Sequence, residues 1–337
     1  MNTRRACLAL AVSCAVVSLS ALTACDRRAD EPPPPPAAPL KLQAYLWPGA
    51  FWVDIASDQG WFTEAGLEVE VVNTNADYFG ALAAIADGRL DVGFFTLFDA
   101  IRFRREGADL VCVAAVDQSD GMDGIVARHG IASVTALRHK RVGVAKGSYN
   151  DYILGVVLAY EGMARTDLTI VDVPGEQSPA ALARGAVDAA VTWEPYLTDA
   201  KARSNGRKLW DSSRIPGISP SMLTTRRAVA RSRTAELQKL LQIWQRGAEF
   251  IRRRPDDAFV IVARVNKVPL ATVRALAALD RVLTLRDNLD AFSYAQGFTS
   301  LHGTIRVMND YFARQGTAGP SVDSDALLDP RFLKGLP

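Results

Sequence analysis

The sequence offers few residues that could carry catalysis or bind a metal. Only three histidines and four cysteines occur in 337 residues, and His129, His139 and His302 lie far apart along the chain. It contains no GxSxG elbow, Walker-type phosphate loop or HExxH pair, and metal sites need several such side chains at close spacing. We therefore predict no catalytic residue, no metal site and no cofactor.

Cysteine becomes scarcer once the N-terminal segment is set aside. Cys7 and Cys14 lie in that segment and Cys25 lies at its end, which leaves Cys112 alone in the rest of the chain. A single cysteine cannot form an intramolecular disulfide bond, and Cys112 stands in the apolar run from Leu110 to Val116, which is typical of a buried strand. We predict that Cys112 packs in the core and is not a nucleophile.

An excess of charge of one sign is also lacking. Without Arg4 and Arg5, 37 basic residues stand against 37 acidic ones, so the remaining chain has no formal net charge. Proteins that bind nucleic acids usually carry an excess of basic residues on one face. The composition therefore predicts that nucleic acid is not a partner.

The N-terminus has the features of an export signal. Arg4 and Arg5 precede an apolar run from Ala6 to Leu22, which is typical of a secretory signal peptide and is short for a membrane span. The sequence Leu-Thr-Ala-Cys that ends at Cys25 resembles the lipobox of bacterial lipoproteins. This resemblance implies a signal peptide over residues 1–24 and a diacylglycerol anchor on Cys25.

A tether follows the expected anchor. Prolines fill positions 32–36 and recur at position 39, so residues 25–39 should form a solvated, extended segment outside the fold. Asp26, directly after Cys25, resembles the signal that keeps lipoproteins of Gram-negative bacteria on the inner membrane. We therefore expect a membrane-anchored protein on the periplasmic side of that membrane.

One stretch of the chain changes from strand to helix across a small-residue turn. Residues 141–152 read RVGVAKGSYNDY, in which β-branched residues predict a buried strand and Ser148 is a good N-cap for a helix from Tyr149 to Ala164. Free N–H groups and the helix dipole meet at Gly147 and Ser148. Because such turns bind anionic groups, we predict that this one can hold an oxyanion.

The pattern of strands and helices occurs twice. Residues 88–93 read GRLDVG and residues 185–190 read GAVDAA, and each piece follows a predicted helix and contains the start of a predicted strand. The surrounding elements follow the same order at a separation of roughly 100 residues. The repeat predicts two similar α/β lobes, each with a mostly parallel sheet.

Ligands of such lobes bind at the carboxyl ends of the strands. Four turns occupy those positions, and they are unusually aromatic: Trp47, Phe51, Trp52, Phe98, Tyr149, Trp193 and Tyr196. Core packing would explain any one of these side chains, but their clustering at equivalent turns favours a pocket. The residues that we predict to bind a ligand are Trp47, Phe51, Trp52, Thr96, Asp120, Asp123, Gly147, Ser148, Tyr149, Trp193 and Glu194.

These residues lie in segments that resemble a known family. LQAYLWPGAFW, GWFTEAGLEVEVV, DGRLDVGFFT, LRHKRVGVAKGS and GAVDAAVTWEPY resemble, in this order, the periplasmic solute-binding proteins of ABC importers for nitrate, sulfonate and taurine. Relatives of that class bind pyrimidine precursors of thiamine. The resemblance implies the type II periplasmic-binding-protein fold, in which ligand closes a cleft between two lobes.

The resemblance also implies how the chain is divided. By that pattern lobe 1 would comprise residues 40–116 and 225–337, and lobe 2 residues 117–224, with crossing strands at Leu110 to Ser119 and Ser221 to Thr225. Helices expected from the apolar spacing include Thr234 to Arg254, Asp256 to Val265, Leu270 to Leu283 and Tyr294 to Gln315. The expected state is a monomer that works with an ABC permease and its ATPase subunits.

Acidic residues border the expected cleft. Residues 117–124 read DQSDGMDG, which is either an exposed loop or a ligand-facing segment through Asp120 or Asp123. Glu194 at a strand end is a similar candidate. Acids beside aromatic rings favour a ligand with a cationic or amino group, and together with the turn at Gly147 they suggest a small zwitterion.

The sequence leaves three functions open. The first is capture of a small organic solute, sulfonate-like, amine-like or pyrimidine-like, for an ABC transporter. The second is an enzyme, because the same fold resembles the pyrimidine-forming enzyme of thiamine synthesis, although a reactive histidine is absent from the predicted cleft. The third is a solute-sensing module for a membrane regulator. We expect the first.

Overall fold

Two β-sheets organise the part of the chain that the structure describes. The computed structural model describes residues 38–334 and 336, which belong to one unit, Ala38–Pro337. The expected signal peptide, Cys25 and nearly all of the tether lie outside the described residues.

The first sheet, sheet A, has six strands within the described residues, in the order β11-β4-β10-β3-β1-β2. Strands β1 and β2 run parallel, as do β1 and β3, whereas β10 is antiparallel to β3 and β4, and β11 is antiparallel to β4. The bounds are β1 Leu40–Ala44, β2 Val69–Asn73, β3 Val92–Thr96, β4 Leu110–Ser119, β10 Pro220–Arg226 and β11 Asp280–Val282. We call sheet A and its helices lobe 1.

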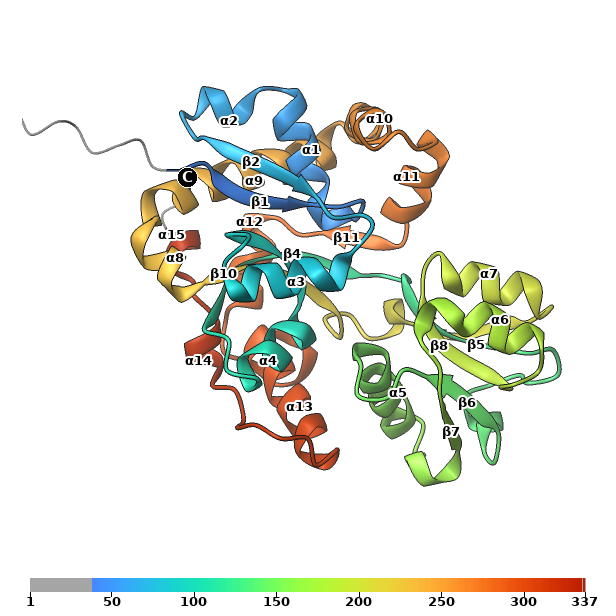
Figure 1. Ribbon diagram of the computed structural model, residues 1–337. Helices are drawn as coiled ribbons and strands as arrows, with labels where there is room; N and C mark the ends of the chain where they lie inside the picture. Colours follow the sequence, from blue (N-terminus) through green and yellow to red (C-terminus); the bar gives the residue numbers. More distant parts are fainter. Residues whose placement is uncertain (1–37, 335, 337) are drawn as a thin grey trace, which may run out of the picture. The chain divides into compact units, whose positions relative to one another are not determined.

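The second sheet, sheet B, has five strands in the same described range, in the order β7-β6-β8-β5-β9. Strand β6 is parallel to β7 and β8, and β5 is antiparallel to β8 and β9. The bounds are β5 Asp123–Ala127, β6 Arg141–Val144, β7 Thr169–Asp172, β8 Ala189–Trp193 and β9 Arg207–Asp211. Sheet B and its helices are lobe 2 (Figure 1).

The predicted repeat is confirmed in atomic detail. Gly88 and Gly185 both end helices in the left-handed conformation, with φ of 93° and 72°, which favours glycine. In each lobe the following aspartate accepts a backbone N–H from the neighbouring strand: Lys41 to Asp91 at 3.0 Å, and Arg141 to Asp188 at 2.9 Å. Each sheet therefore contains the same parallel trio, and the strands that lie next to the lobe connections are antiparallel.

Helices cover both faces of the sheets. In lobe 1 and the C-terminal region they are α1 Phe51–Asp58, α2 Trp61–Glu64, α3 Tyr78–Asp87, α4 Leu97–Arg105, α8 Arg227–Ser232, α9 Thr234–Arg253, α10 Pro255–Asn266, α11 Leu270–Ala277, α12 Leu285–Ala291, α13 Leu301–Arg314, α14 Ser324–Leu327 and α15 Arg331–Lys334. In lobe 2 they are α5 Tyr149–Tyr160, α6 Ser178–Ala183 and α7 Tyr196–Arg203.

Several predicted helices are correct and three are too long. The helix predicted from Tyr149 to Ala164 ends at Tyr160. The apolar face predicted for α9 is buried, including Leu237, Leu240 and Trp244. The helix predicted over Leu270 to Leu283 was wrong in its second half, because Asp280–Val282 pairs with β4 as strand β11. The helix predicted from Tyr294 begins only at α13, where Ser300 accepts a hydrogen bond from the N–H of Gly303 at 3.1 Å and caps the first turn.

The chain passes between the lobes twice. It leaves sheet A after β4 and enters β5 through Asp120–Met122, and it returns to β10 through residues 212–219. The two passages are bound together, since the Ser119 N–H donates to the Ser219 carbonyl at 3.1 Å and the Gly121 N–H donates to the Ser212 hydroxyl at 2.8 Å. The strands predicted as crossings, β4 and β10, are neighbours in sheet A and lead into these passages.

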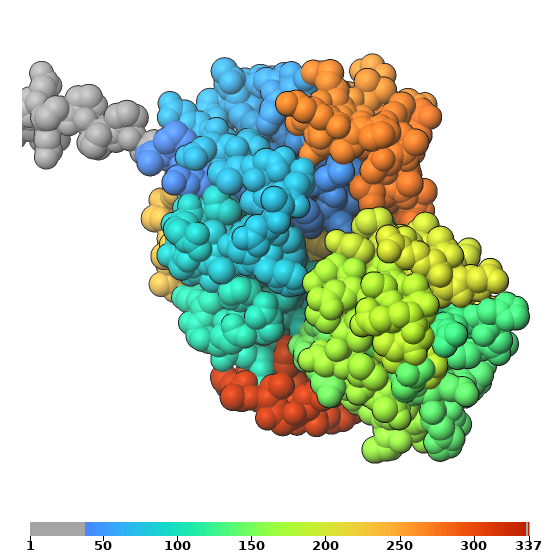
Figure 2. Space-filling model, turned by 45° about the vertical axis from the view of Figure 1, so that its right-hand side comes forward, coloured from blue at the N-terminus to red at the C-terminus, as the bar shows by residue number. Residues whose placement is uncertain are grey.

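The lobes also touch through aromatic side chains. Phe98 of α4 lies 5.6 Å from Tyr152 of α5 and 4.8 Å from Phe312 of α13, measured between ring centroids. Figure 1 shows α5 on the side of lobe 2 that faces α13, and Figure 2 shows the two lobes meeting along a narrow seam. Cys112 is fully buried in β4, as predicted.

Candidate functional site

Three predicted ligand residues of lobe 2 come together. Asp123 at the start of β5 is the register partner of Trp193 at the end of β8. The Asp123 carboxylate is buried and accepts hydrogen bonds from the Tyr149 hydroxyl at 3.3 Å and the Ser219 hydroxyl at 3.4 Å. Burial raises the pKa of Asp123 to about 6. These residues form the lobe 2 side of the candidate site.

Trp193, the strand partner of Asp123, is half-buried. Its ring lies over Gly175, where an added Cβ would come within 2.0 Å of it, and it meets Tyr196 edge-on at 5.5 Å. Close approach of an aromatic ring therefore requires glycine at position 175. Glu194, the next residue, is engaged instead by Thr198, whose N–H and hydroxyl donate to its carboxylate at 3.1 and 2.9 Å.

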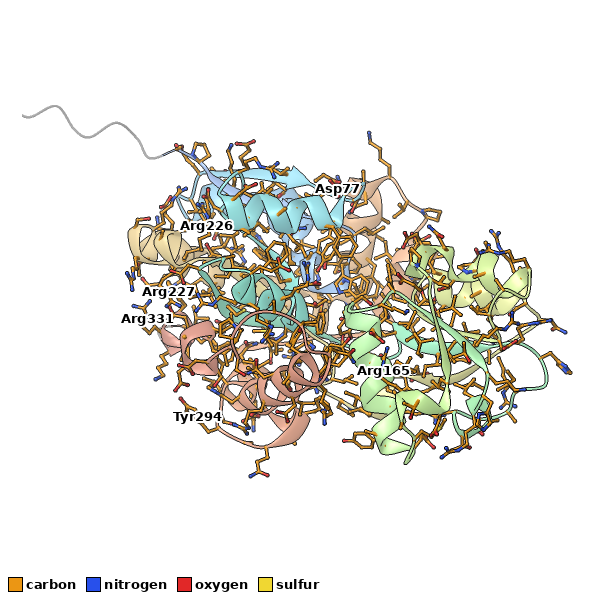
Figure 3. The ribbon with its side chains drawn as sticks, turned by 60° about the horizontal axis from the view of Figure 1, so that its bottom comes forward. Asp77, Arg165, Arg226, Arg227, Tyr294 and Arg331 are labelled. Carbon is orange, nitrogen blue, oxygen red and sulfur yellow. The ribbon has the colours of Figure 1, made fainter. Side chains whose placement is uncertain are left out.

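The turn at Gly147 and Ser148 is already occupied by carboxylates of the protein. Ser148 caps α5 as predicted. However, the Gly147 N–H donates to Asp151 at 2.9 Å, and the Lys146 N–H donates to Asp172 at 3.0 Å. The Asp151 carboxylate also accepts from Tyr311 at 3.1 Å and pairs with Arg165, which Figure 3 labels near the border of the lobes. The donors expected to hold an oxyanion thus serve this internal network.

Aromatic rings form the lobe 1 side. Tyr45, just after β1, stacks on Trp47 with ring centroids 6.3 Å apart, and it lies 5.6 Å from Tyr78 at the start of α3. All three rings are half-buried, and the indole N–H of Trp47 is shielded from solvent without a hydrogen-bond partner. Thr96 caps α4 by accepting from the Asp99 N–H at 3.0 Å.

Two of the predicted aromatic residues lie in the hydrophobic core. Phe51 and Trp52 begin α1 and are at most 1% exposed. Trp52 packs so closely on α9 that a Cβ added to Gly247 would lie 2.5 Å from its own Cβ. The helical face that they share packs α1 on α9 and α10, and we leave both residues out of the candidate site.

Two further carboxyl groups, which the sequence analysis did not single out, lie on the lobe 1 side. Asp117 of β4 is fully buried, and the Gly49 N–H donates to its Oδ2 at 2.9 Å. A Cβ at Gly49 would be 2.1 Å from that oxygen, so this approach requires glycine. Asp280 of β11 lies beside β4, where it is the register partner of Ser119. Its two carboxylate oxygens are shielded from solvent and make no hydrogen bond.

Electrostatics link these acids. Burial raises the pKa of Asp117 to about 6, and the nearby polar groups of Ser221, Gly49 and Trp47 reduce the rise. Burial raises the pKa of Asp280 well above its usual range, and repulsion from Asp117, Asp123 and Asp120 adds to the effect. Asp120 itself is exposed, and its N–H donates to the Leu279 carbonyl at 2.9 Å.

The surroundings of the site are apolar and acidic. In residues 38–334, no lysine, arginine or histidine forms an ion pair with Asp117, Asp123 or Asp280. Within the same range, no three His, Cys, Asp or Glu side chains lie close enough together to hold a metal ion. No helix among the described residues is long and apolar enough to cross a bilayer.

Comparison with known proteins places the chain in a family. The family profile described as NMT1/THI5 like matches residues 51–258. A protein named as a binding protein in Brucella abortus is 25% identical over 274 residues, which cover 80% of this chain and 83% of that protein.

Solved structures share the fold. The periplasmic aliphatic sulphonate binding protein SsuA of Escherichia coli has a TM-score of 0.68 at 20% identity, covering 85% of this chain and 90% of that one. The desulfurization enzyme DszB has a TM-score of 0.64 at 16% identity, covering 88% and 97%. The predicted two-lobed periplasmic-binding-protein fold is thereby confirmed. The chain belongs to the NMT1/THI5-like family.

Proposed function

We propose that this protein captures a small organic solute between its lobes and delivers it to an ABC permease. The observation that carries the proposal is that Asp280 lies close enough to Asp123 of lobe 2 and to Tyr45 of lobe 1 for their charges to interact. Tyr45 and Trp47 follow β1 of lobe 1, and Asp123 and Trp193 lie at the ends of paired strands in lobe 2. Open α/β sheets bind ligands at the carboxyl ends of their strands, and half-buried rings with few polar groups are typical of small-molecule sites.

Binding is favoured over catalysis by the side chains present. The fold also serves the enzyme DszB, so the fold alone does not decide between the two functions. His129 and His139 are exposed, whereas His302 stacks on Tyr294 and its Nδ1 lies 2.8 Å from the Ser324 hydroxyl. Burial raises the pKa of the Cys112 thiol to about 12, which disfavours the nucleophilic thiolate. The proposed site therefore binds its solute without a reactive group.

The route to the membrane is part of the proposal. The lipobox-like sequence before Cys25 supports a lipid anchor on the periplasmic side of the inner membrane, and the prolines after it support a spacer. A monomer held in this way would stay close to its permease. A solute-sensing role would use the same capture step.

Thermal unfolding with a broad metabolite library tests the capture step. A solute that binds only the folded protein raises its melting temperature by an amount that grows with concentration. We expect at least one small organic solute to do so. No response to any library member, together with no small molecule retained by freshly purified protein, would reject solute capture.

A further inference from the structure

Buried carboxyl groups elsewhere in this protein have partners. Asp151 pairs with Arg165, and Asp99 pairs with Arg102 at 3.3 Å. Asp54 accepts a hydrogen bond from the Asn266 amide at 2.6 Å. The fold therefore supplies compensation where an acid has only a structural role.

Asp117 and Asp280, at the junction of the lobes, have fewer partners than these carboxyl groups. Oδ1 of Asp117 and both carboxylate oxygens of Asp280 are shielded from solvent and have no hydrogen-bond partner. No hydrogen bond joins the two carboxyl groups, and no cationic side chain of residues 38–334 pairs with either of them. Burying an unpaired carboxylate is unfavourable, and native proteins usually compensate such groups. Asp117 accepts the Gly49 N–H through Oδ2, so the acceptors left without a partner are one oxygen of Asp117 and both oxygens of Asp280, and a ligand can supply the missing donors.

Aromatic rings border the same acids. Asp117 and Asp280 both lie close enough to Tyr45 to raise the pKa of its hydroxyl by repulsion, in addition to burial. Tyr45 stacks on Trp47, and the Trp47 indole lies beside Asp117. Faces of tyrosine and tryptophan attract cations because of the ring quadrupole. The carboxylates and the aromatic rings therefore both favour a positively charged group on the ligand.

The number of acids at this place argues against a bound metal ion. No three acidic side chains in the described part of the chain converge closely enough to bind a metal ion. The unpartnered oxygens are acceptors, so the group that satisfies them must donate N–H hydrogen bonds as well as carry charge.

We propose that the solute carries an N–H-bearing cationic group, such as a primary ammonium or an amidinium, held by Asp117 and Asp280 beside Tyr45 and Trp47. This inference rests on the proposed function and adds the chemical class of the solute. A sulfonate, the ligand named for the structural relative from Escherichia coli, would place its negative charge against these acids. The site of this chain therefore selects against sulfonates at this end of the ligand.

The test uses ligand-free protein, prepared by unfolding in urea and refolding, at pH 7.5. The probes are benzamidinium and putrescine as N–H cations, tetramethylammonium as a cation without N–H donors, and ethanesulfonate as an anion. The variants are Asp117→Asn and Asp280→Asn. Glu161→Gln is the control, because Glu161 is exposed on lobe 2 and its side chain makes no hydrogen bond with any residue that the structure describes.

We expect an N–H cation to raise the melting temperature of the wild type and of Glu161→Gln. Its affinity should fall at least about tenfold in each Asn variant, because each loses a charged acceptor. Tetramethylammonium and ethanesulfonate should have no effect. No response to either N–H cation, or an equal response to tetramethylammonium, would overturn the inference. Stabilisation by ethanesulfonate in the wild type and both Asn variants would overturn it while solute capture stands.

A second readout needs no ligand. If the Asp280 carboxylate has no partner until a ligand binds, it destabilises the ligand-free protein. Asp280→Asn should then raise the melting temperature of the ligand-free protein at pH 8, on the order of 2 °C. A structural carboxylate would have the opposite effect when removed. A fall in melting temperature would therefore overturn the inference independently of any probe.

Discussion

Asp123 combines deep burial with hydrogen bonds from α5 and from the second lobe connection. It is 4% exposed and accepts hydrogen bonds from Tyr149 and from Ser219, which precedes β10. Hydroxyl donors satisfy one carboxylate oxygen without neutralising its charge. The group is therefore held in place but stays sensitive to pH, since burial raises its pKa to about 6.

That raised pKa predicts how stability changes with pH. The unfolded chain has an ordinary aspartate pKa of about 3.9, so the folded protein holds the Asp123 proton more tightly. The contribution to the free energy of unfolding is complete below pH 4 and is lost as pH rises through about 6. Relative to Asp123→Asn, the wild type should lose about 2 kcal/mol of unfolding free energy between pH 4 and pH 7.

Chemical denaturation of both proteins at several pH values measures this difference. Groups other than Asp123 titrate in both proteins and cancel in the comparison, apart from Asp280, which repels Asp123. A difference that is independent of pH, or one that grows in favour of the wild type as pH rises, would contradict the predicted pKa direction.

At the level of elements, α13 connects the lobes through one polar contact and several rings. Tyr311 packs on Phe98 at 5.8 Å and on Tyr152 at 5.7 Å, and its hydroxyl donates to Asp151 at 3.1 Å. Asp151 in turn fixes the turn before α5 through Gly147. Helix α13 thus positions the strand-turn-helix unit of lobe 2.

Tyr311→Phe separates the polar contact from the packing. The ring contacts remain, and Asp151 keeps Arg165 and the Gly147 N–H, so the loss in unfolding free energy should be about 1 kcal/mol. Denaturant unfolding measures it, with Tyr160→Phe as the control, because Tyr160 on α5 is 69% exposed. Equal effects of the two substitutions would show that the hydroxyl of Tyr311 contributes nothing to the link.

Local signals in the sequence predicted these elements to different extents. The glycines and aspartates of the repeat predict the helix ends and strand starts correctly, because these features depend on residues close together in the sequence. Strand β11 could not be predicted in this way. Its three residues, Asp280–Val282, are too few to show a periodic pattern, and they form a strand only because β4 lies beside them. The apolar spacing therefore places Asp280 in a helix, whereas its approach to Asp117 depends on contacts between residues far apart in the sequence.

The same limit applies to the candidate site. Asp123, Tyr149 and Trp193 follow strand ends or turns, and their positions could be predicted from the order of elements. Phe51 and Trp52 follow a strand in the same way, but the helical turn directs them toward Gly247 and the core. Glu194 and Ser148 are helix-terminal residues whose hydrogen bonds stay local.

For the whole molecule, the expected lipid anchor decides where the folded part works. In a Gram-negative host, Cys25→Ala should shift the protein from the membrane fraction to the soluble fraction and remove the diacylglycerol mass from the mature chain. Cys112→Ala is the matched control, because Cys112 is buried in β4 and cannot be lipidated in the folded protein. A mature wild-type chain that lacks the diacylglycerol mass would reject the anchor and leave solute capture unaffected.

Two lobes that share a buried polar junction can close on a solute. We propose that closure presents the surface that docks on the permease, because binding energy shared by both lobes shifts the population toward the closed form.

Trp193 is the aromatic residue of lobe 2 that we expect to contact the solute. The substitution Trp193→Ala should weaken solute binding roughly thirtyfold, because loss of a central aromatic contact often costs about 2 kcal/mol.

Native mass spectrometry of freshly purified protein tests solute capture most directly. We predict a wild-type species heavier than the chain by the mass of one small organic molecule, which denaturation releases. Tyr160→Ala should retain that molecule, and Trp193→Ala should lose most of it. A wild type at the mass of its own chain, with no stabilisation by any metabolite of a broad library, would contradict the account.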